Sequence, residues 1–278
     1  MKQLEGKLIA ESILDRIKEE ISNSSRMPGL AAVLVGDDEA SKLYIDLKKK
    51  AAHRCGILFC DYLLPKDSPQ EMVREVIEHL NGDDDIDGIL VQLPLPENIN
   101  KEELLNSIHP TKDVDGLTLK SRECLTEEKN CFVCPFPKAI LQLLESSKEN
   151  LIGKKAFVLA NSYGFGKYMS DLLKIKGLQS SYGIFSSGEN FSKEMKKSDI
   201  IISALGISGS IISENIKDGA ILIDGGIEKK NGIILGDILV KDFEKRDVIL
   251  SPVPGGVGPV TVACLIENVW LANKRKTL

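Results

Sequence analysis

Three side chains that could do chemistry recur at helical spacing early in the chain. Ser41, Tyr44 and Lys48 stand at positions i, i+3 and i+7, so one side of a helix would carry a hydroxyl, an aromatic ring and an amine. The apolar run 30–35 just before them is typical of a buried strand. Asp38 lies in the turn between the two and is the predicted N-cap of the helix.

A hydrophobic stripe runs along the same predicted helix. Leu43, Leu47 and Ala51 recur at i, i+4 and i+8, and we expect them to face the core. The three polar side chains would then line the edge of a buried surface, where a pocket can open. The alternative is that Lys48 is one solvated lysine in a run of three and Tyr44 only packs.

Two further polar groups follow apolar segments. Gln92 stands in the apolar run 86–95, where an amide is costly to bury without a partner, although it could bond to local backbone. Asp113 and Asp115 flank one valine before Gly116. Aspartates at such a place often serve the turn alone, but one of the two could hold the amide or guanidine-like nitrogens of a substrate.

Apolar runs alternate with amphipathic segments along the whole chain, which predicts right-handed βαβ units and parallel sheets. We therefore expect an α/β protein of two open α/β domains with a cleft between them, and ligands at the carboxyl ends of the strands. The predicted helices are 7–23, one from 39, 68–80, 138–148, one ending near 176, and 260–273; the predicted strands are 29–35, 57–64, 86–95, 155–160, 181–185, 198–203 and 219–224.

The second domain is expected to be Rossmann-like. Strand 155–160 is followed by the glycine turn 161–166 and a helix, an arrangement that places backbone N–H groups and a helix dipole at a phosphate, although the strict GxGxxG is absent. The pattern is irregular around 117–137. The predicted organisation is a first domain of 1–119 plus 260–278, a linker of 120–137 and a second domain of 138–259.

Composition excludes several classes of protein. The net charge of −5 over 278 residues argues against a nucleic-acid partner. No apolar run reaches membrane-spanning length and the start lacks the apolar segment of a signal peptide, so we expect a cytoplasmic protein without a membrane partner. Six scattered cysteines suit reduced thiols. The lone Cys131-x-x-Cys134 and three histidines without ligand spacing predict no metal.

The segment 252–259 concentrates special residues. It reads Pro-Val-Pro-Gly-Gly-Val-Gly-Pro, in which prolines fix the entry and glycines let the backbone approach a ligand closely. A turn alone rarely needs so many in succession.

Four motifs together resemble, in order and spacing, those of the methylenetetrahydrofolate dehydrogenase/methenyltetrahydrofolate cyclohydrolase family of the bifunctional FolD type. They are Ser41-x-x-Tyr44-x-x-x-Lys48, Val91–Pro96, Lys112–Gly116 and Pro252–Pro259. The resemblance covers nearly the whole chain.

The resemblance implies roles for the polar residues. Lys48 would be the catalytic lysine, Gln92 its hydrogen-bonding partner, Tyr44 a stacking surface for the folate, and Asp115 an acceptor for pterin nitrogens. These four are the predicted catalytic residues. The predicted substrate-binding residues are Ser41, Tyr44, Leu93, Asp115, Pro254, Gly255 and Gly256.

The resemblance also implies a dinucleotide, and here the sequence departs from the family. Ala160-Asn161-Ser162 stands where the family usually has Gly-Arg-Ser, so the arginine that would pair with the 2′-phosphate of NADP is missing. Glu189, in a segment without the usual histidine, could bond a ribose diol and favour NAD. NADP is the expected cofactor and NAD is possible. The predicted cofactor-binding residues are Ala160, Asn161, Ser162, Ser186 and Ile227.

The implied activity is oxidation of 5,10-methylenetetrahydrofolate to 5,10-methenyltetrahydrofolate, then hydrolysis to 10-formyltetrahydrofolate, in one-carbon metabolism. Partners would be tetrahydrofolate derivatives and a second copy in a homodimer. Alternatives are a cyclohydrolase with weak or lost dehydrogenase activity, an NAD-dependent dehydrogenase, and a folate-binding protein without catalysis. A shikimate-dehydrogenase-like enzyme would explain neither Val91–Pro96 nor Pro252–Pro259.

Overall fold

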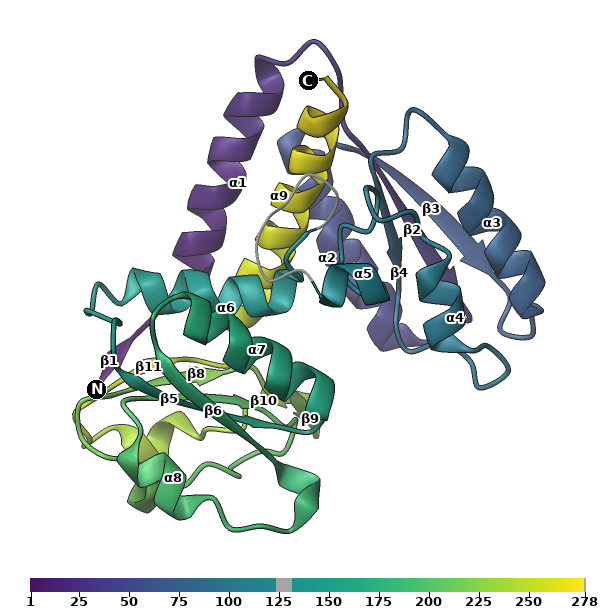
Figure 1. Cartoon of the computed structure of the whole chain (residues 1–278). Helices are drawn as coiled ribbons and strands as arrows, with labels where there is room; N and C mark the ends of the chain where they lie inside the picture. The colour runs from purple at the N-terminus through teal and green to yellow at the C-terminus, as the bar shows by residue number, and fades with distance from the viewer. Residues whose placement is uncertain (124–131, 278) are drawn as a thin grey trace. The chain divides into compact units, whose positions relative to one another are not determined.

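The computed structural model of this chain describes residues 1–123 and 132–277 (Figure 1). Cys131 of the CxxC pair and most of the charged stretch before it therefore lie outside the described residues. The predicted fold class is confirmed: the chain is α/β, with parallel strands in two separate sheets.

The chain divides into two compact units, and both draw residues from distant parts of the sequence. Helices α1 (Gly6–Ser22) and α9 (Val257–Thr277) each contribute residues to both units. The first unit consists of Met1–Ile9 and Phe136–Thr261, and the second of Ala10–Pro135 and Val262–Leu278.

The first unit is built on a six-stranded parallel sheet in the order β1-β11-β8-β7-β5-β6. Helices α6 and α7 lie over one face of the sheet and α8 over the other (Figure 1). The strands are β1 (Lys2–Gln3), β5 (Lys155–Ala160), β6 (Gln179–Ile184), β7 (Ile200–Ala204), β8 (Ala220–Asp224) and β11 (Val248–Ser251). The helices are α6 (Pro135–Ser146), α7 (Tyr163–Ile175) and α8 (Ser192–Lys197), and an antiparallel pair β9 (Glu228–Lys230) and β10 (Ile233–Leu235) stands apart from the sheet.

The second unit is built on a three-stranded parallel sheet in the order β3-β2-β4. A single parallel bridge between Ile89 and Asp113 adds the segment at Asp113 to the sheet beside β4. Valine, isoleucine and leucine side chains of α3 and α4 pack against one face of the sheet. The elements are β2 (Gly29–Val35), β3 (Leu58–Leu64), β4 (Gly88–Val91), α2 (Glu39–Cys55), α3 (Gln70–Gly82), α4 (Lys101–Asn106) and α5 (Leu119–Arg122).

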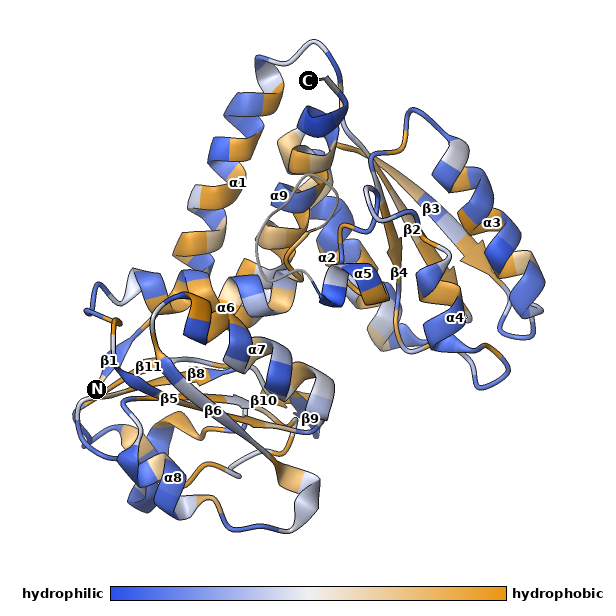
Figure 2. Ribbon diagram, in the orientation of Figure 1, coloured by the Kyte–Doolittle hydropathy of each residue, from blue (hydrophilic) through white to orange (hydrophobic). Residues whose placement is uncertain are grey.

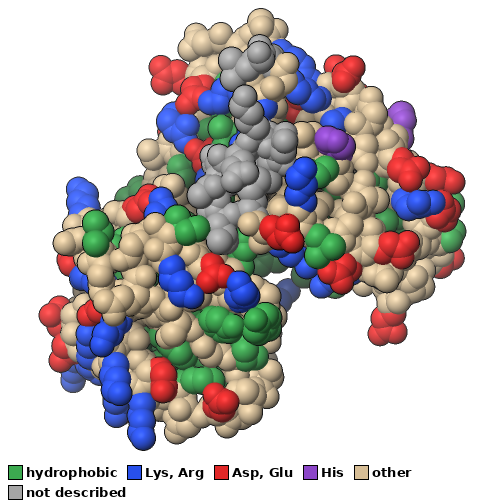
Figure 3. All heavy atoms as spheres, in the orientation of Figure 1, with side chains coloured by type: hydrophobic (Ala, Val, Ile, Leu, Met, Phe, Trp, Pro, Cys, Tyr) green, Lys and Arg blue, Asp and Glu red, His purple; other side chains and the backbone are tan. Residues whose placement is uncertain are grey.

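Hydropathy follows the layers within each unit. Figure 2 shows hydrophobic residues concentrated on the strands and on the helix faces turned toward them. Figure 3 shows basic and acidic side chains interspersed over the face in view. None of the helices within the described ranges is both long enough and apolar enough to span a bilayer.

Helix α2 begins where its cap predicts but buries a different face. The side chain of Asp38 accepts a hydrogen bond from the Ser41 backbone N–H at 2.8 Å, as expected of an N-cap. The prediction that Leu43 and Leu47 face the core is wrong, because they are 55% and 45% exposed. The buried residues of α2 are Ser41, Ile45, Ala51, Ala52 and Cys55.

Side-chain size explains this difference. Small residues let a helix approach its neighbours closely. The stripe that includes serine, alanine and cysteine therefore faces the core, although the leucines dominate the hydrophobic pattern. Lys48 falls between Ile45 and Ala52 on that buried stripe, rather than beside it.

Other elements also differ from the sequence-based expectation. The predicted strand 86–95 is only four residues long as β4, because Pro94 and Pro96 have no N–H to continue the ladder. The two-residue strand β1, the short helix α8, the β9–β10 pair and strand β11 were not predicted.

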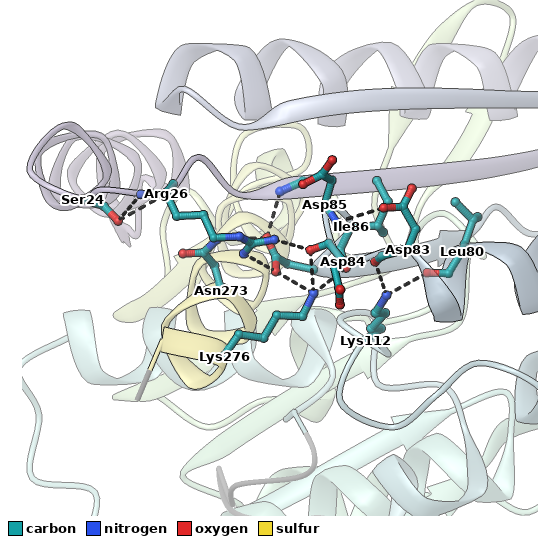
Figure 4. Close-up of polar contacts among 12 residues, drawn as sticks. Ser24, Arg26, Leu80, Asp83, Asp84, Asp85, Ile86, Lys112, Asn273 and Lys276 are labelled. Carbon is teal, nitrogen blue, oxygen red and sulfur yellow. Dashed lines mark hydrogen bonds and ion pairs between the residues drawn. The ribbon is translucent and has the colours of Figure 1, made fainter.

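A buried carboxylate ties the end of α9 to the amino-terminal edge of the small sheet. Asp87 is fully buried and accepts hydrogen bonds from Arg26 Nη1 at 2.7 Å, from Asn273 Nδ2 at 3.0 Å and from the backbone N–H of Gly29 at 3.0 Å. Lys276 Nζ lies 3.2 Å from the same carboxylate. Figure 4 shows Arg26, Asn273 and Lys276 converging here.

Lysine side chains donate hydrogen bonds to backbone carbonyls of the neighbouring turn between α3 and β4 (Figure 4). Lys112 Nζ, itself buried, donates to the carbonyls of Leu80 at 2.8 Å and Asp83 at 2.6 Å. Lys276 Nζ donates to the carbonyl of Asp84 at 3.1 Å. The last turns of α9, the start of β2 and this turn are thus held as one cluster.

We predict that Asp87→Ala lowers the free energy of unfolding by about 3 to 5 kcal/mol, because it removes a fully buried carboxylate that accepts hydrogen bonds from Arg26, Asn273 and the Gly29 backbone N–H. Denaturant titration followed by circular dichroism measures the change. Asp84→Ala is the matched control: only the backbone carbonyl of Asp84 takes part in the cluster, so its effect should stay within about 0.5 kcal/mol. Equal losses in the two variants would contradict the role of the Asp87 carboxylate.

Candidate active site

Lys48 and Gln92 are joined by a hydrogen bond. Lys48 Nζ donates to Gln92 Oε1 at 3.0 Å. The other end of the amide is also engaged, because Gln92 Nε2 donates to the carbonyl of Leu93 at 2.8 Å. Gln92 is 8% exposed, so this buried amide is satisfied on both sides and its oxygen is turned toward the amine.

The parallel sheet explains why these two residues meet. Helix α2 follows β2, Gln92 follows β4, and β2 and β4 are neighbours. The backbone N–H of Gln92 donates to the carbonyl of Val33 at 2.9 Å, which fixes its position against β2. Segments that leave neighbouring parallel strands start from the same edge of the sheet.

The two aspartates of the 113–115 pair have different surroundings. Asp113 is fully buried, and its carboxylate accepts hydrogen bonds from the backbone N–H groups of Leu117 at 3.1 Å and Thr118 at 2.9 Å. It therefore builds the turn. The Asp115 carboxylate accepts no hydrogen bond from any residue of the described ranges.

Lys48 and Asp115 influence each other's protonation. Burial lowers the pKa of Lys48, and the carboxylate of Asp115 opposes that change. Burial raises the pKa of Asp115, the ammonium of Lys48 opposes the rise, and Asp113 adds to it. An amine whose pKa is lowered toward neutrality can both take up and release protons.

The other predicted residues of this unit lie on the segments that carry Lys48 and Gln92. Tyr44 lies one turn before Lys48 on α2 and is 37% exposed, so its ring is open to a flat ligand. Ser41 is buried at the start of α2 and Leu93 is half-buried after β4. The structure thus brings Ser41, Tyr44, Lys48, Gln92, Leu93 and Asp115 into one unit.

Pro254, Gly255 and Gly256 belong to the first unit. The carbonyl of Gly255 accepts a hydrogen bond from the Lys7 backbone N–H at 3.2 Å, and φ at Gly255 is 104°, a value that favours glycine. A Cβ on Gly6 would come within 1.9 Å of the Gly256 carbonyl oxygen. The close approach that these glycines permit is therefore used, at least in part, by the start of α1.

The predicted cofactor residues follow strands of the large sheet. Ala160 ends β5, and Ser162 caps α7 by accepting a hydrogen bond from the Phe165 backbone N–H at 3.3 Å. Ser186 is exposed after β6, and Ile227 is 46% exposed after β8. All of them lie at carboxyl ends of strands in one parallel sheet, the edge where such sheets bind ligands.

The turn after β5 fits a phosphate. The first N–H groups of a helix have no partner within the helix, and around a Cβ placed on Gly164, in the first turn of α7, there is no other atom within 4 Å. Asn161 is engaged elsewhere, because its side-chain amide donates to the carbonyl of Leu205. The Asn161 amide is therefore committed to the backbone of the loop after β7.

Two buried carboxylates of the first unit, Asp224 and Asp237, were missed by sequence reasoning. The signal available in the sequence was a glycine next to each of them: Gly225 follows Asp224, and Gly236 precedes Asp237. Among residues 1–123 and 132–277, no group of three or more histidine, cysteine, aspartate or glutamate side chains is arranged to hold a metal ion.

Comparisons with known proteins cover both parts of the chain. Residues 4–115 match the family model for tetrahydrofolate dehydrogenase/cyclohydrolase, catalytic domain. Residues 134–277 match the model for the NAD(P)-binding domain of the same family.

Individual relatives match over nearly their whole length. The bifunctional protein FolD of Methanoculleus marisnigri is 38% identical over 99% of this chain and 97% of the relative. The crystal structure of the bifunctional FolD enzyme of Campylobacter jejuni has a TM-score of 0.94 and 34% identity, and the match covers 99% of both chains. The Trypanosoma brucei FolD, solved with NADP cofactor and an inhibitor, has a TM-score of 0.90 and 31% identity over 98% of this chain and 97% of that one. This chain belongs to the tetrahydrofolate dehydrogenase/cyclohydrolase family, as its four motifs predict.

Proposed function

We propose that this protein oxidises 5,10-methylenetetrahydrofolate to 5,10-methenyltetrahydrofolate with NADP and hydrolyses the product to 10-formyltetrahydrofolate. The observation that carries the proposal is the hydrogen bond between Lys48 and Gln92. The carboxylate of Asp115 acts electrostatically on the same lysine. The chain also matches both the catalytic and the NAD(P)-binding domain of the family. The relatives named bifunctional protein FolD support it.

Lys48 is the proton carrier of the hydrolytic step in this proposal. A water forms a C–O bond to the cationic methenyl carbon and loses a proton. The C–N bond that then breaks needs a proton on the departing nitrogen, while the remaining hydroxyl becomes the formyl C=O and releases its proton to solvent. The Lys48 amine takes up the first proton and returns one to the nitrogen. Burial favours the neutral amine that the uptake requires, and Gln92 fixes where that amine lies.

The folate is recognised by the residues around the lysine. Tyr44 stacks on its aromatic system with a ring that is partly exposed. Asp115, which accepts no hydrogen bond from the described residues, takes those of the pterin amino and ring nitrogens. Ser41 and Leu93 complete this part of the proposed site. Pro254, Gly255 and Gly256 are proposed as further substrate contacts because of their family motif.

The turn after β5 receives the dinucleotide in this proposal. When bound, the dinucleotide supplies the hydride acceptor for the oxidation. The N–H groups of the first turn of α7 and the Ser162 cap hold a phosphate, while Ala160, Asn161 and Ile227 shape the surface beneath it. Ser186 is exposed and free to donate to a 2′-phosphate, which supports NADP; Glu189, also exposed, is the residue that would favour NAD.

The proposal also assigns roles to the parts of the chain. Residues 1–119 and 260–278 form the folate-binding catalytic domain, 138–259 the dinucleotide domain, and 120–137 the linker. A cytoplasmic location is also proposed, and it is supported by Cys55 and Cys60, which form no disulfide.

A homodimer is part of the same proposal. Strand β3 is an edge strand, and it exposes Leu58 and Leu63, which are 47% and 67% accessible. Exposed apolar side chains on a sheet edge suit a second copy of the chain. Light scattering on the purified protein tests this, and a monomer at micromolar concentration would contradict it.

A paired assay tests the proposed function. Purified protein is given methenyltetrahydrofolate to follow hydrolysis, and methylenetetrahydrofolate with NADP or with NAD to follow reduction. We expect hydrolysis together with reduction of NADP in preference to NAD. Hydrolysis without reduction of either dinucleotide would leave only a cyclohydrolase, and neither activity would overturn the proposal.

We predict that Lys48→Met reduces the hydrolysis of methenyltetrahydrofolate by about 100-fold or more, the usual range for loss of a general acid–base group. Binding of NADP, measured by calorimetry, should not change. Lys50→Met, an exposed lysine of the same run, is the matched control and should hydrolyse at the wild-type rate. A Lys48→Met protein that keeps the full rate would refute the role given to Lys48.

The pKa of Lys48 should fall further below its usual range in Asp115→Asn, because the carboxylate that opposes the effect of burial is then gone. A pH titration of the lysine signals by NMR measures this, with Lys48→Met to assign the resonance. Asp46→Asn removes an exposed carboxylate from α2 and should leave the titration unchanged. A rise in the Lys48 pKa in Asp115→Asn would contradict the coupling.

A further inference from the structure

Two carboxylates are buried near the carboxyl-terminal edge of the six-stranded sheet. Asp224 is the last residue of β8 and is 1% exposed; Asp237 follows β10 and is fully buried. No lysine or arginine of the described ranges forms an ion pair with either. Since an unpaired buried carboxylate is costly, the chain must satisfy these two in another way.

Backbone N–H groups from three loops supply the hydrogen bonds. Asp224 accepts from Gly226 at 2.9 Å, from Asp237 at 3.1 Å and from Ile238 at 2.8 Å. Its own backbone N–H donates to Ser251 Oγ at 2.9 Å. The Asp224 side chain thus fixes the loop after β8 and the segment after β10, and its backbone N–H holds the end of β11.

Asp237 extends the network to the loop after β7. Its carboxylate accepts hydrogen bonds from the backbone N–H groups of Leu205 at 2.8 Å and Ile207 at 2.9 Å. Its backbone carbonyl accepts from Ile211 at 3.1 Å. The loops after β7, β8 and β10 are therefore tied to one another through two carboxylates.

Glycines let the loops close over these carboxylates. A Cβ on Gly226 would lie 2.0 Å from Asp237 Oδ1, and a Cβ on Gly236 would lie 2.1 Å from Asp224 Oδ2. Any side chain at either glycine would push its loop away. Burial raises the pKa of Asp224 to about 7, and the neighbouring Asp237 carboxylate adds to the rise. The backbone N–H donors lower the pKa, so the ionised form of Asp224 depends on them.

We propose that Asp224 and Asp237 are positioning residues for the dehydrogenase step, which hold the loops after β7 and β8 in the shape that receives the dinucleotide. This rests on the proposed function. These loops leave the sheet at the edge where parallel sheets bind ligands, and they present Ile207 and Ile227 to solvent at 42% and 46% exposure. The two carboxylates shape the backbone from beneath and do not touch the ligand.

Asp224→Asn and Asp237→Asn test this inference. Each puts an amide NH₂ where an oxygen accepted a backbone N–H, so two donors face each other and a loop must move. We expect the Kd for NADP, measured by calorimetry, and the KM for NADP to rise about tenfold or more. A change of this size corresponds to the loss of about one hydrogen bond to a charged group. Methenyltetrahydrofolate hydrolysis should stay within about twofold of wild type, since Lys48, Gln92 and Asp115, the groups proposed for its chemistry, lie in the other unit.

Asp199→Asn is the matched control. Asp199 precedes β7 at the opposite edge of the same sheet, and it accepts hydrogen bonds from the Lys155 backbone N–H at 2.7 Å and from Lys217 Nζ at 2.6 Å. Its loss should lower the melting temperature without changing the Kd for NADP. A rise in Kd equal to that of the Asp224 and Asp237 variants would mean general destabilisation and would overturn the inference.

A milder variant covers the case in which the two asparagine variants do not fold. Gly206 has φ of 69° and lies between the two N–H groups that Asp237 binds. Gly206→Ala strains that loop without touching a carboxylate, and it should also raise the Kd for NADP. If all folded variants bind NADP with the wild-type Kd, this inference is overturned and the proposed function still stands. If the wild-type protein binds neither NADP nor NAD, the proposed function is overturned.

Discussion

Parallel strands deliver the ends of distant segments to one edge of a sheet, and this constraint decides where polar groups can meet in this protein. Lys48 and Gln92 are 44 positions apart in sequence, yet each belongs to the segment that leaves one of two neighbouring strands. The loops bound by Asp224 and Asp237 meet for the same reason. In both units polar groups from distant segments thus meet at the carboxyl ends of the strands.

Carboxylates have different partners at the two edges of the sheets. At the amino-terminal edge, Asp87 and Asp199 combine backbone N–H donors with a cation, so the charge is neutralised where it lies. At the carboxyl-terminal edges, Asp224 and Asp237 have backbone N–H donors and no cation among the described residues, while Asp115 has the ammonium of Lys48 near it and accepts no hydrogen bond from the described residues. The first arrangement stabilises the fold, while the last leaves a carboxylate available to another molecule.

The sequence predicted most of the regular elements because their signals are local. The apolar run 30–35 and the Asp38 cap fixed one strand and one helix start almost to the residue. The buried face of that helix was predicted wrongly, since Leu43 and Leu47 dominate the pattern but small residues make the contact. Strand β1, at two residues, is too short to show any periodicity.

The candidate site could be predicted by residue type but not by environment. Whether Asp113 or Asp115 remains open depends on which backbone N–H groups fold back onto each, and no spacing rule shows that. The engagement of Asn161 with Leu205 likewise joins the ends of two strands 44 positions apart. Motif order identified the family, and only the three-dimensional contacts separated structural from available side chains.

The division of the chain constrains its biogenesis. The first unit needs residues 1–9 as well as residues up to 261, and the second needs residues from 262 onward. During synthesis, neither unit can therefore close until almost all of the chain has left the ribosome. Strands β2, β3 and β4 can pair with one another early, but both units lack residues until α9 is made, so a chain truncated before α9 would leave both incomplete.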